Sequence, residues 1–435
     1  MQKSGVFLAW LMLFLVILLN GCAGLPFLPT SAPTPQSTPD QTPIPNTPTP
    51  LVTPQLTTPP SQDITIWLPP EFNPASANPG AELLRNRLAQ FEKDQGIKVN
   101  VRIKAANGVG GLLEALNAAS VAAPTALPGV IALLRPDLEV AAVKGQIVPL
   151  DGISKAMNSP DWFDYAHQLA LVQGAAFGLP FAGDAMLTVY RPSKISPPPD
   201  NWDAILHLGQ PLAFAAASQQ SPLSTLLYQS LGGEIEDAQR RPVLESDLLG
   251  QVYSLYRQAA DRGVFPTWLT QYESESQVWQ IYQENRVDAV FTWSSLFLST
   301  PDKDSAILPI VSPNGKAASL ATGWLWAVSD PIPERRELSV KLMEWLSEPD
   351  FLGKWNEATG SLPTRPSALA GWKNQAMKAA LSQVAVAASP RPSSDLISSL
   401  GPILRDGTMK VIRLEIEPQQ AANQAVEKLA SPPQP

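Results

Sequence analysis

One carboxylate stands alone in an apolar run of this 435-residue chain. Asp184 lies in GLPFAGDAMLTVY, residues 178–190, among Phe, Ala, Gly and Met. Burying such an acid costs free energy unless a hydrogen-bond donor satisfies it. The donor could belong to the protein backbone or to a polar ligand, and the residues alone leave both readings open.

Catalytic chemistry finds little support in the rest of the chain. There is no GxSxG elbow, no HExxH and no P-loop. Glu71 and Asp184 are acids of the kind that glycosidases pair, but nothing in the sequence specifies the separation of their carboxylates. We therefore predict that the protein is not an enzyme.

The sequence also contains few residues that could bind a metal or a cofactor. His167 and His207 are the only histidines and lack ligand spacing, so we expect both to be helix-surface or packing residues. Cys22 is the only cysteine, which excludes a disulfide framework and a thiolate cluster. We predict no metal and no cofactor.

Charge and length limit the class further. The formal net charge of -8 and a pI near 5.0 argue against nucleic acid as a partner, since such binding needs a basic face. A chain of 435 residues is too long for one simple core, and two lobes are expected.

The N-terminus reads as a targeting segment over residues 1–22. Lys3 precedes an apolar run from 6 to 19, too short for a comfortable membrane span. The run ends in Leu-Asn-Gly-Cys, which resembles a bacterial lipoprotein box with Cys22 as the lipidated residue. An ordinary secretory signal with a chance cysteine, or an uncleaved anchor, is the alternative.

Residues 23–62 form a low-complexity segment in which Pro and Thr dominate. This composition cannot bury a core and favours extended backbone. At ~3 Å per residue the segment could hold a domain on the order of 100 Å from its anchor. We predict a disordered stalk.

From residue 63 onward, short apolar strands alternate with amphipathic helices. Ile64 to Trp67 is a strand, and Leu84, Leu88 and Phe91 then form one apolar stripe of a helix. This alternation predicts an α/β lobe with a mostly parallel sheet. The expected strands and helices after these are strands at 97–103, 128–134, 212–217, 287–293 and 321–328, and helices at 136–143, 223–231, 248–260, 272–284, 334–346 and 396–429, the last with a break at 405–407.

The order of these segments resembles a known family, the bacterial extracellular solute-binding proteins of family 1, the maltose-binding type. The resemblance covers residues 63–430. It rests on the order of soft motifs, namely ITIW…FEKDQGIKVNV, LPGVIALLRPDLEVAAVKGQIVPL, GLPFAGDAMLTVY, ENRVDAVFTW, GWLWAVSD, MEWLSEPDFLGKWNEATGSLPTRPSAL and ASPRPS…LEIEPQQAANQAVEKL.

The resemblance implies a periplasmic-binding-protein type II fold: two α/β lobes, a hinge and a central ligand cleft. The N-lobe would comprise residues 63–181 plus 317–370, and the C-lobe 182–316 plus 371–430. The family's function implies a monomer that takes a small solute, here a mono- or oligosaccharide, to the transmembrane subunits of an ABC importer. The run at 178–190 would be the first crossing between the lobes.

The resemblance also implies ligand-binding positions, because aromatic rings stack on sugar faces and charged planar groups bind hydroxyls. They are Trp67, Glu71, Arg135, Asp137, Asp184, Trp293 and Trp324. The bland alternative for the tryptophans is core packing, and for the charged residues a solvated loop. Trp326 shares a strand face with Trp324 and is expected in the core.

Two other functions remain open. The same fold could bind a non-sugar solute such as a polyamine or a peptide. The protein could instead be an orphan binding lipoprotein with a sensor or structural role. All these readings place it outside the cytoplasm, anchored to the cell membrane by Cys22.

Overall fold

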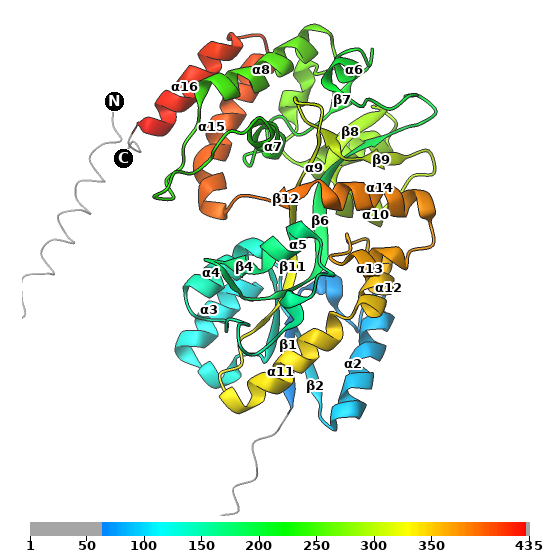
Figure 1. Ribbon diagram of the computed structural model, residues 1–435, viewed down its shortest axis with the longest axis vertical. Helices are drawn as coiled ribbons and strands as arrows, with labels where there is room; N and C mark the ends of the chain where they lie inside the picture. The colour runs from blue at the N-terminus through cyan, green and yellow to red at the C-terminus, as the bar shows by residue number, and fades with distance from the viewer. Residues whose placement is uncertain (1–62, 432–435) are drawn as a thin grey trace, which may run out of the picture. The chain divides into compact units, whose positions relative to one another are not determined.

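Two long strands, β6 (Leu179–Tyr190) and β11 (Ala317–Val328), organise residues 63–431, the part of the chain that the computed structural model describes. They pair antiparallel between Trp326↔Leu179 and Ala321↔Ala185. At ~3.3 Å per residue, twelve residues span about 40 Å. Each strand is therefore long enough to serve two groups of elements, one at each end (Figure 1). The predicted targeting segment, Cys22 and the stalk lie outside the described residues.

The first group surrounds a parallel sheet. Strand β1 pairs with β2 on one side and β3 on the other, and β11 adds antiparallel to β3. β1 and β3 are almost wholly buried because helices cover the sheet, as expected of a parallel sheet. The bounds are β1 Ile64–Leu68, β2 Val99–Ile103, β3 Val130–Leu134, β4 Leu171–Val172, β5 Ala175–Ala176, α2 Ala81–Gln95, α3 Leu112–Ala122, α4 Arg135–Val143, α5 Asp164–Ala170, α11 Pro333–Leu346, α12 Pro349–Thr359 and α13 Pro366–Ala370.

The second group is built on the other half of β6. Strand β8 pairs antiparallel with β6, and β7 pairs parallel with β8. The bounds are β7 Leu212–Ala213, β8 Ala289–Trp293, β9 Ala306–Leu308, β10 Ile310–Val311, α6 Trp202–Leu206, α7 Pro222–Ser230, α8 Ser246–Asp261, α9 Glu275–Gln283, α10 Ser294–Ser299, α15 Ser394–Ile412 and α16 Pro418–Ala430.

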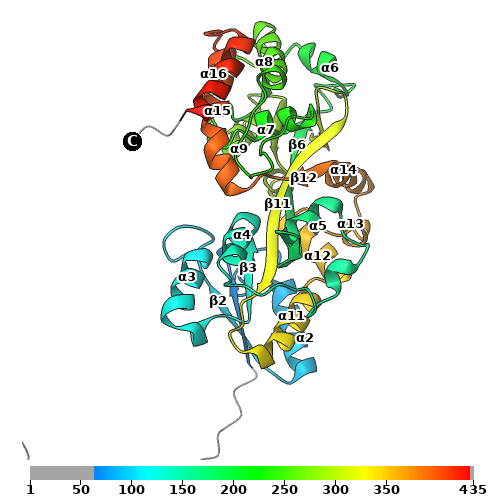
Figure 2. The same cartoon turned by 60° about the vertical axis from the view of Figure 1, so that its left-hand side comes forward.

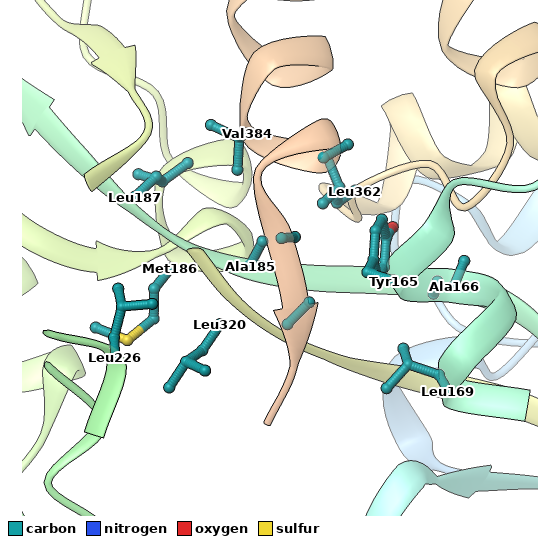
Figure 3. Close-up of a cluster of buried hydrophobic side chains, with 14 of the residues drawn as sticks. Tyr165, Ala166, Leu169, Ala185, Met186, Leu187, Leu226, Leu320, Leu362 and Val384 are labelled. Carbon is teal, nitrogen blue, oxygen red and sulfur yellow. The ribbon is translucent and has the colours of Figure 1, made fainter. Parts of the chain in front are cut away.

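A third segment passes between the groups beside the two long strands. It consists of α14 (Gln375–Val386) and β12 (Ala388–Pro390), and β12 pairs parallel with β11 (Figure 2). Apolar side chains pack around this crossing from both directions. Met186 of β6, Leu320 of β11 and Leu226 of α7 lie together, while Leu362 and Tyr165 lie farther along β6 (Figure 3).

The β6–β11 ladder is interrupted at Phe181. Trp324 faces Ala182, but the next residue, Leu325, faces Pro180, so Phe181 is extra. A bulge fits this point because Pro180 has no N–H to give to the ladder. The Phe181 ring lies stacked on Trp326 at a centroid distance of 3.8 Å. Trp326 is completely buried, as expected of a core residue.

Most predicted elements are confirmed, and the helical tail is the main correction. Leu84, Leu88 and Phe91 are buried along α2, which ends at Gly96 with φ +68°. The predicted break at 405–407 is wrong: α15 runs through it to Ile412. Gly407 allows close packing instead, since a Cβ there would lie 2.3 Å from the Tyr253 hydroxyl.

None of the helices between residues 63 and 431 combines the length and the apolar composition that a bilayer crossing demands.

Gly183 of β6 supplies a test of the crossing. Its backbone exchanges two hydrogen bonds of 2.8 Å with Leu362, and a Cβ would lie 2.3 Å from the Tyr165 hydroxyl and 2.9 Å from the Leu362 carbonyl. We expect Gly183→Ala to lower the free energy of unfolding by about 1–3 kcal/mol, the usual cost of overpacking. Urea denaturation of the purified protein measures it.

Gly371 is the matched control for this substitution. It has φ -70°, and a Cβ there would meet only the Ala368 carbonyl, at 3.4 Å. Gly371→Ala is expected to change the unfolding free energy by less than about 0.5 kcal/mol. Equal effects of the two substitutions would show that the crossing is not tightly packed at Gly183.

Candidate functional site

A cavity of about 370 Å³ opens where β6 and β11 pass each other. The two strands contribute cross-strand neighbours to it, with Thr322 opposite Asp184 and Gly323 opposite Gly183. The full lining is Glu71, Phe72, Asn78, Pro79, Leu134, Ala182, Gly183, Asp184, Ser295, Thr322, Gly323, Trp324, Thr359, Gly360 and Ser361. We call it the first cavity.

Asp184 is held at this cavity by the start of α10. One carboxylate oxygen, Oδ1, accepts hydrogen bonds from the Ser294 hydroxyl and the Ser295 N–H, both at 2.9 Å. The other, Oδ2, accepts from the Ser295 hydroxyl at 2.6 Å. The partners of this acid therefore include backbone and side chains of the protein. Oδ2 keeps room for a further donor, since a carboxylate oxygen accepts about two bonds.

Burial raises the pKa of Asp184 above its ordinary value, and the hydrogen bonds from Ser295 and Ser294 oppose that rise. The side chain is half-buried, so part of it reaches the cavity. No basic residue belongs to the lining of this cavity. The carboxylate of Asp184 is thus stabilised by neutral donors from Ser294 and Ser295, and the cavity lining adds no cation.

Two aromatic rings belong to the apolar part of the lining. Phe72 meets Trp324 edge to face at a centroid distance of 5.6 Å, and it meets Phe181 at 5.3 Å. Phe72 itself is buried while Trp324 is half-buried. The aromatic core beneath thus fixes the orientation of the Trp324 ring that faces the cavity.

Glu71 lies in the loop that follows β1. It belongs to a short 3-10 helix, Pro70–Phe72, that the proline pair at 69–70 opens. The Asn78 amide donates to the Glu71 carbonyl at 3.2 Å and so ties the loop to itself. Glu71 is exposed overall, yet partial desolvation by its surroundings raises the pKa of its carboxyl.

A second cavity, of about 170 Å³, adjoins the first at two places. Thr322 lines both, and Leu134 of the first is followed directly by Arg135 of the second. Its lining is Arg135, Pro136, Glu139, Ile235, Glu236, Arg240, Thr322, Arg391, Pro392, Ser393, Ser394 and Leu396. Residues of both groups and of the crossing segment thus meet there.

The predicted charged residues at the start of α4 are only partly at these cavities. Arg135 lines the second cavity, where its guanidinium bonds the Leu171 carbonyl at 3.0 Å and Glu139 at 3.3 Å. Asp137 lines neither cavity, and burial raises the pKa of its carboxyl.

Two predicted tryptophans lie elsewhere. Trp67 is 3% exposed, and its indole N–H has no partner among residues 63–431. The Lys104 ammonium covers its ring at 4.4 Å. Trp293 is half-buried at the end of β8, beside Glu275, and lines neither cavity. The first cavity thus brings together three of the seven predicted positions, Glu71, Asp184 and Trp324.

Several lining residues were not predicted. Phe72 directly follows Glu71, and Ser295 lies two residues after Trp293, so proximity to predicted positions was a usable signal for both. Thr322 and Arg391 carried no such signal. Within residues 63–431 no group of three or more His, Cys, Asp and Glu side chains is placed to hold a metal ion.

Comparison with known proteins identifies the chain's relatives. Residues 86–381 match the family model described as bacterial extracellular solute-binding protein. No curated protein matches the sequence.

Solved structures match over nearly their whole length. The sugar-binding protein MalE of Xanthomonas citri is 20% identical, with a TM-score of 0.68 over 85% of this chain and 97% of that one. The cyclic alpha-maltosyl-1,6-maltose binding protein of Arthrobacter globiformis is 15% identical, with a TM-score of 0.69 over 84% and 97%. A solute-binding protein of Thermotoga lettingae bound with alpha-D-tagatose is 20% identical, with a TM-score of 0.61 over 85% and 99%. These matches confirm the predicted type II fold with two α/β lobes.

The raised pKa of Asp184 predicts a pH dependence of stability. At pH values from about 4 up to the raised pKa of folded Asp184, the folded state binds more protons than the unfolded state, so the stability of the wild type falls as the pH rises through this range and then levels off. Asp184→Asn removes this loss. The unfolding free energy of the variant minus that of the wild type should therefore increase between pH 4 and 8, as measured by urea denaturation.

Asp302→Asn is the control. The hydrogen bond from Arg191, at 2.6 Å, lowers the pKa of Asp302, so its contribution changes only below about pH 5. Its difference from the wild type should stay flat from pH 5 to 8. A flat difference for Asp184→Asn as well would contradict the predicted pKa shift.

Proposed function

Because the chain belongs to the bacterial extracellular solute-binding proteins, we propose that it binds a mono- or oligosaccharide between two closing lobes and delivers it to an ABC importer. The family is one of binding proteins, in line with the prediction that the chain is not an enzyme. Several structural relatives are described as sugar-binding proteins or are bound to a sugar. That this chain also binds a sugar is our proposal.

The observation that carries the sugar is the composition of the first cavity. One part of it is aromatic, with Trp324 held by Phe72. Another part is polar, with Asp184, Ser295 and Thr322. A sugar needs both, because its C–H face packs on a ring while its hydroxyls bond to carboxylates and hydroxyls. A volume of about 370 Å³ is within the range of small-molecule sites.

In this proposal the crossing strands act as the hinge. The N-lobe comprises residues 63–181 plus 317–370, and the C-lobe 182–316 plus 371–430. Each lobe moves as a body, while small changes of backbone angle in β6, β11 and the segment before β12 bring the lobes together. Asp184 and Thr322 lie on those strands, so the ligand would contact the hinge directly.

The remaining partners follow from the N-terminal sequence. Cys22 would carry the lipid that anchors the protein outside the cytoplasm, and residues 23–62 would let the binding domain, a monomer, reach the transmembrane subunits of the importer. We propose no cofactor and no nucleic acid as partners.

A non-sugar ligand has one observation in its favour. The first cavity contains two carboxylates, Glu71 and Asp184, and no basic residue in its lining. A polyamine would neutralise both through charge-assisted hydrogen bonds. This is the second candidate, and the ligand screen below decides between the two.

We expect a carbohydrate to raise the thermal unfolding midpoint of the purified protein. A ligand at 100 times its Kd stabilises the folded state by about 2.7 kcal/mol when it binds only that state. A thermal-shift screen of mono- and oligosaccharides, amino acids and polyamines measures this. A shift with polyamines alone would replace the sugar by the second candidate, and no shift with any carbohydrate would refute the sugar.

Trp324→Ala should weaken binding of the identified sugar roughly 10- to 100-fold, since a ring that covers a sugar face contributes about 1.5–3 kcal/mol. Trp268→Ala is the matched control, because Trp268 packs on Tyr272 and lines neither cavity. Trp293→Ala tests the predicted stacking of Trp293, and unchanged affinity would remove that residue from the site. Titration calorimetry gives the three affinities.

The anchor has its own test. Cells expressing the wild-type protein should incorporate a radioactive fatty acid into it, and Cys22→Ser should abolish the label while leaving the amount of protein similar. Labelling that persists in Cys22→Ser would refute the lipid anchor at this residue. Immunoblotting of the same samples supplies the control for expression.

A further inference from the structure

We propose that the second cavity is an anion-binding subsite, in which Arg391 recognises an acidic substituent of the bound saccharide, a carboxylate or a phosphate. This inference rests on the proposed function and narrows its ligand from sugars in general to acidic sugars. It is carried by the pairing of the charges around the cavity.

The lining of the second cavity contains three arginines and two glutamates. Arg135 is paired with Glu139 at 3.3 Å, and Arg240 is paired with Glu236 at 3.7 Å. Arg391 is the third arginine. No carboxylate oxygen of residues 63–431 lies within 4.0 Å of its guanidinium, and no hydrogen bond joins that group to an acceptor in this part of the chain. The pairing thus leaves one cation over.

Burial makes this unpaired cation costly. Arg391 is half-buried, and burial lowers the pKa of its guanidinium, against the effect of Glu275. The charge of Glu275 opposes this lowering, yet among residues 63–431 Glu275 makes no direct ion pair with Arg391. A guanidinium carries five donors in a planar fork, and a carboxylate or phosphate satisfies two of them at once. An anionic ligand group would therefore supply the acceptor that the protein does not.

The backbone holds Arg391 firmly at this place. Its N–H donates to the Ala321 carbonyl of β11 at 2.8 Å, and Pro390 pairs with the same residue in the β11–β12 ladder. Pro392 follows, so prolines restrict the backbone on both sides. The backbone that carries the guanidinium is therefore ordered before a ligand binds, so binding does not have to order it.

The start of α15 adds to the same field. Its N-cap Ser393 and first residue Ser394 line the cavity, and the helix runs for 19 residues. The N-terminal end of a helix carries partial positive charge. This contribution is secondary to the full charge of Arg391.

The two cavities together orient the ligand. The first cavity has Glu71 and Asp184 and no cation in its lining, so it repels an acidic substituent. The second has three positive and two negative side chains, which leaves one positive charge. Since Thr322 lines both, a saccharide bound in the first cavity can extend its acidic group toward Arg391.

Titration calorimetry on the full-length protein tests this subsite with three matched disaccharides: maltose, its counterpart with a terminal glucuronate, and maltose 1-phosphate. We expect at least one acidic disaccharide to bind at least tenfold more tightly than maltose. A preference for the glucuronate form identifies a carboxylate subsite, and a preference for the phosphate form identifies a phosphate subsite. Failure of both acidic disaccharides to exceed maltose would overturn the inference.

The residue is tested with Arg391→Gln and Arg391→Lys. Arg391→Gln should abolish the preference for the acidic form and leave maltose binding within about twofold. Arg391→Lys keeps the charge without the planar fork, and it should keep part of the preference. Arg262→Gln is the control, because Arg262 is exposed beside His207 and lines neither cavity.

Two results for the variants would contradict the role of Arg391. A full preference in both variants would show that another group binds the anion. An equal loss of acidic and neutral sugar would show that Arg391 only supports the fold. If Arg391→Gln fails to fold, Arg391→Lys alone decides. An unchanged preference of Arg391→Lys for the acidic disaccharide would then contradict recognition by the planar guanidinium. Sugars that bind in the thermal-shift screen without any acidic preference would leave the proposed function standing and remove this subsite.

Discussion

The pairing of β6 with β11 is the constraint on which the rest of the structure depends. Each strand gives one half to the first sheet and the other half to the second group of elements, so the backbone bonds between them join both groups. The bulge at Phe181 bends this ladder beside Pro180 and places a ring in the aromatic core. Because Asp184 and Thr322 face each other on the same ladder, the polar groups of the first cavity are positioned by the hydrogen bonds that connect the lobes.

The charges of the site show how much desolvation the fold tolerates. Asp184 is held by hydroxyl and backbone donors, so its charge is accommodated locally without a cation in the cavity lining. Between residues 63 and 431, Arg391 has no comparable acceptor. Hydrogen bonds to charged groups stabilise the fold more than hydrogen bonds between neutral groups. A buried charged group that is left without a partner costs more free energy than a typical hydrogen bond contributes. The asymmetry between these two residues is therefore informative: one is satisfied by the protein and the other is not.

The sequence predicted elements better than it predicted the directions of side chains. Asp184 could be singled out because an acid among apolar residues is costly, and this argument needs no fold. Trp67 could not be assigned, since β1 is covered on both faces and the sequence does not say towards which face the Trp67 ring turns. Arg391 was missed because its unpaired state depends on which acids the fold brings near it. The tail helix was broken wrongly at Gly407, where a missing side chain serves packing against Tyr253 and not a turn.

The two prolines beside Arg391 have a consequence for association between molecules. Directly after β12 the Arg391 N–H still donates to Ala321 of β11, so the nitrogens of its neighbours Pro390 and Pro392 lie on the side that faces away from β11. A proline nitrogen has no hydrogen to offer to an incoming strand. At these two positions this edge of the sheet therefore offers no donor to an incoming strand, which limits edge-to-edge aggregation.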